Sequence, residues 1–158
     1  MKWYKRTIIL ALGLGIEVCF AVLSGLLIKA NGEWVASLIL PYFAPRSPLF
    51  FGMLSGVMHI FSSLALAAYA ERKDLLPKGI FLTITEGISE LVFLAFFFEL
   101  TYEISSFFIA TGCMLLSVIC LWIYSKKSDS AALLKLPVVH IKIYLWMIVY
   151  CILTLNFT

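Results

Sequence analysis

Five long apolar blocks, separated by short polar or proline-containing stretches, run through this chain of 158 residues. Each block is close to the length of about 20 residues that an α-helix needs to cross a bilayer. Backbone groups inside a bilayer have no water to bond, so each block is expected to be helical. The predicted fold is an all-α integral membrane protein, a single five-transmembrane-helix bundle over residues 1–158 with spans at about 7–29, 48–70, 79–99, 103–124 and 137–155.

The composition is that of a membrane protein. The chain is 63% hydrophobic and 13% charged, whereas a soluble domain carries about 25% charged residues. The sequence has no basic stripe interleaved with aromatic residues, so the expected partner is the lipid bilayer and not a nucleic acid. The first apolar run is longer than the roughly 7–15 residues of a secretory signal core, which predicts an uncleaved first helix. Because no targeting segment is recognisable, the bacterial cytoplasmic membrane is the expected location.

Lysine and arginine are distributed unevenly among the segments between the blocks. These residues gather on the cytoplasmic side of membrane proteins. With the N-terminus inside and the C-terminus outside, nine of them fall in inner segments and only Lys29 and Arg46 in outer ones. Lys142, within the fifth block, is expected to extend its ammonium group to the inner surface. The nine inner residues are Lys2, Lys5, Arg6, Arg72, Lys73, Lys78, Lys126, Lys127 and Lys135.

The longest break between blocks is a proline-rich stretch, which we call the lid (residues 30–47). Proline lacks an N–H and clashes with the preceding turn, so Pro41 and Pro45 cannot lie inside a helix, whereas Pro48 suits the first turn of the second helix. The lid is also apolar, with Trp34 and Phe43 in need of cover. It is therefore expected to be a rigid, partly helical connection that lies over the outer end of the bundle.

Ionisable side chains occur inside the apolar blocks. Glu17, His59 and Glu90 lie near the middle of three different spans, and Glu86 shares a helix face with Glu90. Such groups are costly in a membrane and by default mark function. Two interpretations stay open: the groups satisfy one another inside the bundle, with a His59–carboxylate pair as the expected contact, or they form a ligand or proton site.

The sequence offers no support for catalytic or metal chemistry of a familiar kind. One histidine per helix with scattered acids lacks the spacing of metal ligands, and no catalytic triad or glycine-rich phosphate loop is recognisable. No residue is therefore assigned a catalytic or metal-binding role. Gly52 and Gly56 form a GxxxG pattern, which indicates close helix packing either within the protomer or at the face of a homodimer.

The lid carries a recognisable residue pattern. Trp34, Ala36-Ser37-Leu38, Pro41, Phe43 and Pro45 resemble the W-x-A-S-L-x-x-P-x-F/W-x-P-P hallmark of the TspO/translocator protein family, the tryptophan-rich sensory proteins. Three further segments resemble parts of that family: Glu86-x-x-x-Glu90 followed by Phe97-Phe98 in the third helix, Ala131–Pro137 before the fifth, and the closing Leu155-Asn156.

The resemblance implies a membrane receptor for an apolar planar ligand held under the lid. Family members bind porphyrins, sterols and synthetic aromatic ligands there, so it implies a bound porphyrin, heme or sterol-like molecule, with a transport or regulatory role and no required cofactor. By the same resemblance Trp34, Phe43 and Phe93 form aromatic walls and Glu90, Glu86 and His59 a polar floor. The implied ligand-binding residues are Trp34, Pro41, Phe43, Pro45, His59, Glu86, Glu90 and Phe93.

This chain departs from the family pattern at several of these positions. Phe93 stands where the family has Trp, Glu86 and Glu90 where it has Gln and Asn, and Arg46 where it has the second Pro. A more acidic floor favours a cationic or metal-bearing ligand. Two alternatives remain: a proton-coupled transporter that uses the midplane Glu and His residues, and a porphyrin-degrading activity that needs a redox-active aromatic residue such as Trp34.

Overall fold

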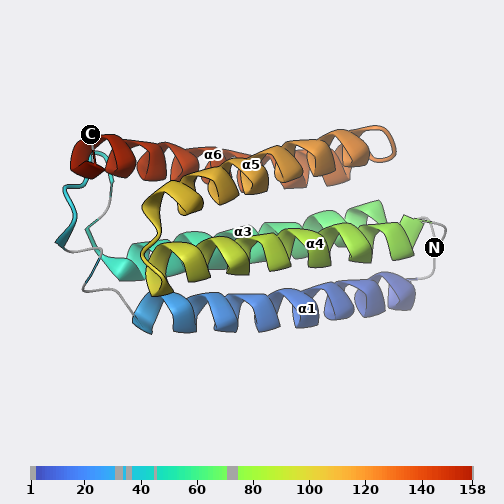
Figure 1. The fold of residues 1–158 in the computed structure, drawn as a ribbon. Coiled ribbons are helices and arrows are strands. Elements are labelled where there is room, and N and C mark those ends of the chain that lie inside the picture. Colours follow the sequence, from blue (N-terminus) through green and yellow to red (C-terminus); the bar gives the residue numbers. More distant parts are fainter. Residues whose placement is uncertain (1–2, 31–33, 35–36, 45, 71–74, 158) are drawn as a thin grey trace.

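In the part of the chain that the structure describes, five helices are long and apolar enough to cross a bilayer (Figure 1). The structure is a computed structural model that describes residues 3–30, 34, 37–44, 46–70 and 75–157. No strand occurs among these residues, so the expected all-α architecture is confirmed. The elements are α1 (Trp3–Ala30), α3 (Pro48–Tyr69), α4 (Leu76–Leu94), the π-helical turn η2 (Ala95–Glu99), α5 (Glu103–Ser125) and α6 (Asp129–Phe157).

The helices close into a bundle in which successive helices run in opposite directions (Figure 1). Helix α1 packs against α3 and α4, α6 packs against α3 and α5, and α4 also packs against α5. The lid and the C-terminus lie at one end, which we call the lid end. The N-terminus and the α5–α6 turn lie at the other.

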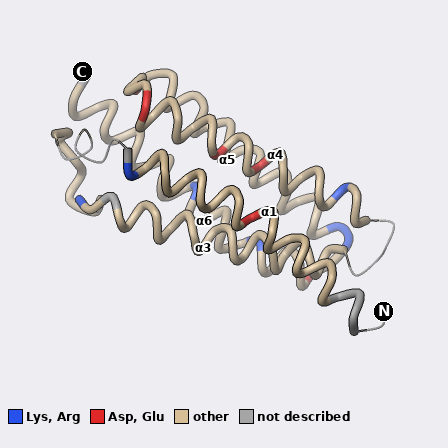
Figure 2. Tube along the Cα trace, turned by 90° about the horizontal axis from the view of Figure 1, so that it is seen from below, with Lys and Arg blue, Asp and Glu red and all other residues tan. Residues whose placement is uncertain are grey.

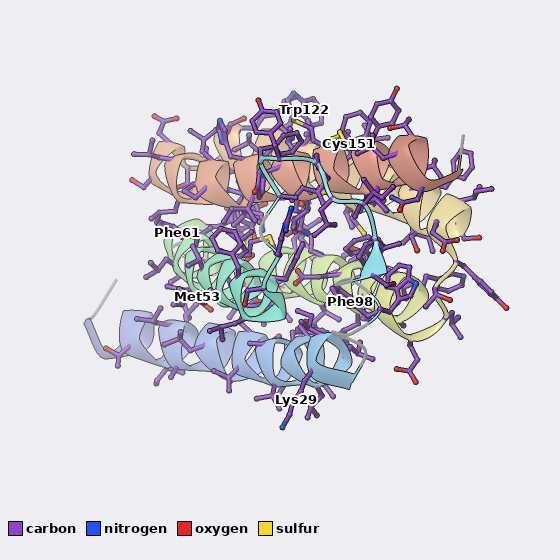
Figure 3. All side chains as sticks on the ribbon, turned by 90° about the vertical axis from the view of Figure 1, so that its left-hand side faces the viewer. Lys29, Met53, Phe61, Phe98, Trp122 and Cys151 are labelled. Carbon is purple, nitrogen blue, oxygen red and sulfur yellow. The ribbon has the colours of Figure 1, made fainter. Side chains whose placement is uncertain are left out.

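The outside of the bundle is apolar. Most of the length of every helix carries no charged residue (Figure 2). Large hydrophobic side chains are exposed on several helices, among them Leu49 at 72%, Phe108 at 68% and Leu133 at 68%. Viewed from the lid end, Lys29 and Trp122 point away from the bundle on opposite sides (Figure 3). An apolar exterior of this kind is the surface that a lipid bilayer solvates.

Pro48 opens helix α3, as predicted, but Pro137 does not open a helix. Helix α6 begins at Asp129, eight residues before the expected start at 137, and Pro137 lies inside it. Ser128 caps the N-terminus of this helix, because its Oγ accepts a hydrogen bond from the Ala131 N–H at 3.2 Å. An interior proline is tolerated in membrane helices, where neighbouring groups satisfy the freed carbonyl.

Close helix contact depends on glycines other than those of the GxxxG pattern. A Cβ atom built on Gly52 or on Gly56 meets nothing within 4 Å, so this pattern does not pack helices within the protomer. A Cβ atom on Gly87 would lie 2.5 Å from the ring of Phe20, where α4 approaches α1. Gly87 is therefore the residue that allows α1 and α4 to come together.

The lid is tied to helix α6. The side-chain amide of Asn156 accepts a hydrogen bond from the Ile39 N–H at 2.8 Å and donates one to the Ile39 carbonyl at 3.0 Å. The Tyr144 hydroxyl donates to the Phe43 carbonyl at 2.9 Å. Apolar lid side chains, including Trp34 and Leu38, pack on the cluster of buried residues at this end of the bundle. The described part of the lid thus covers the interior, as expected.

Candidate functional site

Three helices bring Glu17, His59 and Glu90 together in the interior. His59 donates from Nδ1 to the Glu17 carboxylate, and its Nε2 lies 3.6 Å from Glu90 Oε1. The Ser55 hydroxyl donates to the same Glu90 oxygen at 2.9 Å. All four residues are buried, with 4–7% of their surface exposed. The expected pairing of His59 with a carboxylate is confirmed, and it involves a carboxylate on each side of the ring.

A second buried group surrounds Glu86. Its carboxylate lies 2.5 Å from Lys135 Nζ and 3.8 Å from Lys142 Nζ, and it accepts a hydrogen bond from Ser117 at 2.7 Å. Lys135 also donates to the Ser62 hydroxyl at 2.8 Å. Because Glu86 and Glu90 are one helical turn apart, the two groups adjoin. Together they form what we call the ion cluster: Glu17, His59, Glu86, Glu90, Lys135 and Lys142.

The two lysines of the ion cluster correct the sequence analysis. Lys135 was expected in an inner loop, and Lys142 was expected to reach the membrane surface, but Lys135 is fully buried and Lys142 is 7% exposed. Both predictions were wrong because helix α6 begins before Lys135. The two lysines are seven residues apart, which is about two helical turns, so both face the interior. That spacing, together with the apolar Val138 and Val139 between the lysines, was the sequence signal that both lysines lie on one buried face of a helix.

The ion cluster holds three carboxylates, two lysines and one histidine. With every carboxylate and lysine ionised and His59 neutral, its net charge is −1, and one further proton makes it neutral. An uncompensated charge in a low-dielectric interior is costly. The cluster is therefore electrically balanced when it holds one proton in addition to those of its lysines.

A cavity of about 30 Å³, which we call the aromatic cavity, adjoins the ion cluster at Glu90 and is lined mainly by buried residues on which the lid packs. Among its described lining residues Glu90 alone is charged, and Ser55 is the other residue with a polar side chain. The rest are aliphatic, aromatic or methionine side chains. The lining residues are Ile28, Phe51, Ser55, Met58, Glu90, Phe93, Leu94, Phe97, Phe98, Leu145, Ile148 and Val149.

Two smaller voids adjoin this cavity. One of about 20 Å³ reaches Lys142 and Trp146, and one of about 10 Å³ lies among the residues of the ion cluster. Met58 and Glu90 line all three spaces. A water molecule needs roughly 10–15 Å³, whereas pockets for drug-sized ligands measure about 300–1,000 Å³. The structure therefore shows this region in a closed packing.

The structure brings only part of the implied ligand set to the aromatic cavity. Glu90 and Phe93 line it, and Trp34 lies edge-on against the lining residue Phe97, with ring centroids 5.1 Å apart. His59 and Glu86 instead line the void of about 10 Å³ among the residues of the ion cluster.

The remaining implied residues belong to the lid. Phe43 turns toward Tyr144, with ring centroids 6.4 Å apart, and Pro41 is buried, but neither lines the cavity. Pro45 lies outside the described residues.

No group of three or more His, Cys, Asp or Glu side chains among the described residues is arranged to hold a metal ion. No protein-family model and no curated protein matches this chain, so the geometry of the aromatic cavity and the ion cluster carries the functional inference.

Proposed function

We propose that this chain is an integral membrane protein that binds an apolar planar ligand, tetrapyrrole-like or sterol-like, between the lid and Glu90. One observation carries the proposal: the aromatic cavity under the lid has apolar walls and a single carboxylate at its floor. Ligand sites are mostly apolar with a few well-placed polar groups. The resemblance of Trp34–Pro45 to the TspO/translocator lid supports the ligand class.

Binding requires the closed packing to open. Met58 and Leu145 line both the aromatic cavity and the void beside Lys142. Methionine is unbranched and adapts readily to a new neighbour. In the proposal, rotation of these two side chains and displacement of the lid join the spaces into one site.

The proposed orientation places the N-terminus inside and the lid outside. Lys78, Lys126 and Lys127 lie at the end opposite the lid, and Lys29 and Arg46 at the lid end. Although Lys135 no longer counts as an inner loop residue, the segments assigned to the inside still hold more lysine and arginine than those assigned to the outside.

The proposal is tested by titrating nanodisc-embedded protein with protoporphyrin IX dimethyl ester, a planar tetrapyrrole without free carboxylates, and following the quenching of tryptophan fluorescence. Val149→Phe places a larger side chain in the aromatic cavity, and we expect it to weaken binding about tenfold or more, because overpacking resists the ligand. Leu115→Phe is the matched control, since Leu115 is 52% exposed on α5. Equal affinities for wild type and Val149→Phe would contradict the site.

A proton-coupled transporter is the second candidate, and the ion cluster favours it. Intramembrane carboxylates and histidines commonly relay protons in transporters. In proteoliposomes, uptake of the ligand would then follow an imposed pH gradient in wild type and in Glu103→Gln, and would stop in Glu90→Gln. Uptake at the same rate with and without the pH gradient would exclude proton coupling.

A further inference from the structure

We infer that the ligand of the aromatic cavity carries an organic cation, such as a protonated amine, that binds the Glu90 carboxylate and replaces the proton held by the Glu17–His59–Glu90 group. The inference rests on the proposed function and specifies the ligand class of the same site.

The charge of the ion cluster is the first argument. Three carboxylates face two lysines and one histidine, so the closed protein is balanced by one extra proton. A cation beside Glu90 supplies the same charge. Both together would leave an excess positive charge in a low-dielectric interior, which is costly. The ligand cation and the proton therefore compete.

The geometry at Glu90 is the second argument. Glu90 lines the aromatic cavity and both smaller voids, and among the residues shared by all three it is the charged one. The neighbouring His59 Nε2 is buried and has no hydrogen-bond partner among the described residues, although Glu90 Oε1 lies 3.6 Å away. A protonated His59 stabilises the Glu90 carboxylate electrostatically over this distance, without a direct hydrogen bond. The Glu90 carboxylate thus accepts a hydrogen bond from the Ser55 hydroxyl. A ligand ammonium group in the cavity would be a stronger, charged donor to the same carboxylate.

The cavity walls are the third argument. Phe51, Phe93, Phe97 and Phe98 form part of the wall of the cavity that Glu90 also lines, beside aliphatic side chains and Met58. Aromatic rings attract cations through their quadrupoles, and a desolvated organic cation gains most from them. An apolar cavity with four phenylalanines and one carboxylate is suited to an ammonium group and is unfavourable for a carboxylate ligand.

The other titratable groups near Glu90 have partners of their own. Glu17 on α1 accepts from His59, and the Cys113 thiol on α5 donates to the Ser89 carbonyl at 3.2 Å. On α6, Lys135 and Lys142 pair with Glu86, and neither lines the aromatic cavity. The proton shared by Glu17, His59 and Glu90 is therefore the one that exchanges.

The exchange conserves charge. A ligand ammonium enters from solution, and one proton leaves the Glu17–His59–Glu90 group for the surrounding buffer. The loaded protein then holds one proton fewer than the empty protein. By linkage, raising the pH strengthens binding, by up to about tenfold per pH unit over the range in which the empty site holds its proton.

The test compares two probes of the same shape, 1-pyrenemethylamine and 1-pyrenemethanol, on nanodisc-embedded protein with empty nanodiscs as background. Calorimetry in two buffers of different ionisation enthalpy counts the protons released. We expect the amine to bind about tenfold tighter than the alcohol and to release about one proton, with no release for the alcohol. In Glu90→Gln the preference and the release disappear while the alcohol still binds, which shows that the variant is folded. Glu103→Gln is the matched control and behaves as wild type.

Three results would overturn the inference. Equal affinities of the two probes would refute the cationic ligand and leave the proposed function standing. Tighter binding of the amine without proton release would refute the exchange. Binding of neither probe would refute the proposed function and the inference with it.

Discussion

At the scale of single residues, Glu86 is the carboxylate that contacts both buried lysines. Its carboxylate contacts Lys135 at 2.5 Å and Lys142 at 3.8 Å. Removing one partner of a buried ion pair leaves an uncompensated charge, which costs about 3–5 kcal/mol. Substitutions in the ion cluster should therefore destabilise the protein more, the more buried charges they leave without an ion-pair partner.

We predict that Glu86→Gln lowers the free energy of unfolding by about 3–5 kcal/mol, because it leaves two lysines without a carboxylate. Lys142→Met has a smaller effect, since Glu86 keeps Lys135 and Ser117. Denaturant unfolding in detergent measures both, with Lys127→Met on the exposed turn as control. A larger loss for Lys142→Met than for Glu86→Gln would contradict this account of the ion cluster.

The residue-level site was only partly predictable from the sequence. Glu17, His59 and Glu90 were found because each lies near the middle of a span, where an ionisable group needs a partner. Lys135 was missed because Pro137 was interpreted as a helix start, which placed Lys135 in a loop. Which phenylalanines enclose the cavity depends on how α4 and η2 rotate against α6, and spacing alone does not determine that.

At the scale of elements, the helices were predictable and their contacts were not. The observed bounds of α1, α3 and α5 lie close to the expected spans, because a bilayer fixes the length of an apolar helix. Helix packing depends on which small residue faces a neighbour. Gly87 faces Phe20 across the α1–α4 contact, whereas Gly56 faces open space.

Gly87→Ala is therefore expected to destabilise the protein by about 1–3 kcal/mol, because the new Cβ meets the Phe20 ring. Gly56→Ala should be neutral or slightly stabilising, since alanine is the better helix former. Thermal unfolding of the two variants makes the comparison, and the double variant Gly87→Ala/Phe20→Leu should recover part of the loss. Equal destabilisation by both single variants would contradict the packing.

The lid is predicted to loosen when its ties to α6 are removed. Asn156→Ala removes both hydrogen bonds to Ile39, and Tyr144→Phe removes the one to the Phe43 carbonyl. Each bond contributes roughly 0.5–1.5 kcal/mol, so backbone amides of residues 37–44 should exchange hydrogen several times faster. Exchange mass spectrometry measures this, with Ser125→Ala at the opposite end as control. Unchanged exchange in the double variant would show that packing alone holds the lid.

At the scale of the whole molecule, an apolar shell encloses a charged interior to which all five helices contribute. Lipid-compatible side chains cover the outside, and the ion cluster with Ser117 of α5 fills the centre. The aromatic cavity occupies the lid half, and Met58 and Leu145 line both this cavity and the void beside Lys142. We expect the opening of the cavity to be the main free-energy cost of the proposed ligand binding.

Met58→Ala is predicted to lower the stability of the protein while raising its affinity for the probe. Truncating a buried methionine lowers the free energy of unfolding by about 2–5 kcal/mol. The same change enlarges the cavity in advance, so 1-pyrenemethanol should bind more tightly than to wild type, because less rearrangement is needed. Met53→Ala, at a position that is 61% exposed on the same helix, should change neither quantity. Weaker binding to Met58→Ala would show that Met58 is a contact and does not close the site.

The most direct test of a ligand site beneath the lid is photolabelling with 1-azidopyrene, with and without excess 1-pyrenemethanol, followed by peptide mass spectrometry. We predict competed labelling in the segments that line the aromatic cavity, which are residues 51–58, 93–98 and 145–149. Labelling confined to lipid-facing residues such as Phe81, Ile104 and Leu115, and unaffected by the competitor, would contradict it.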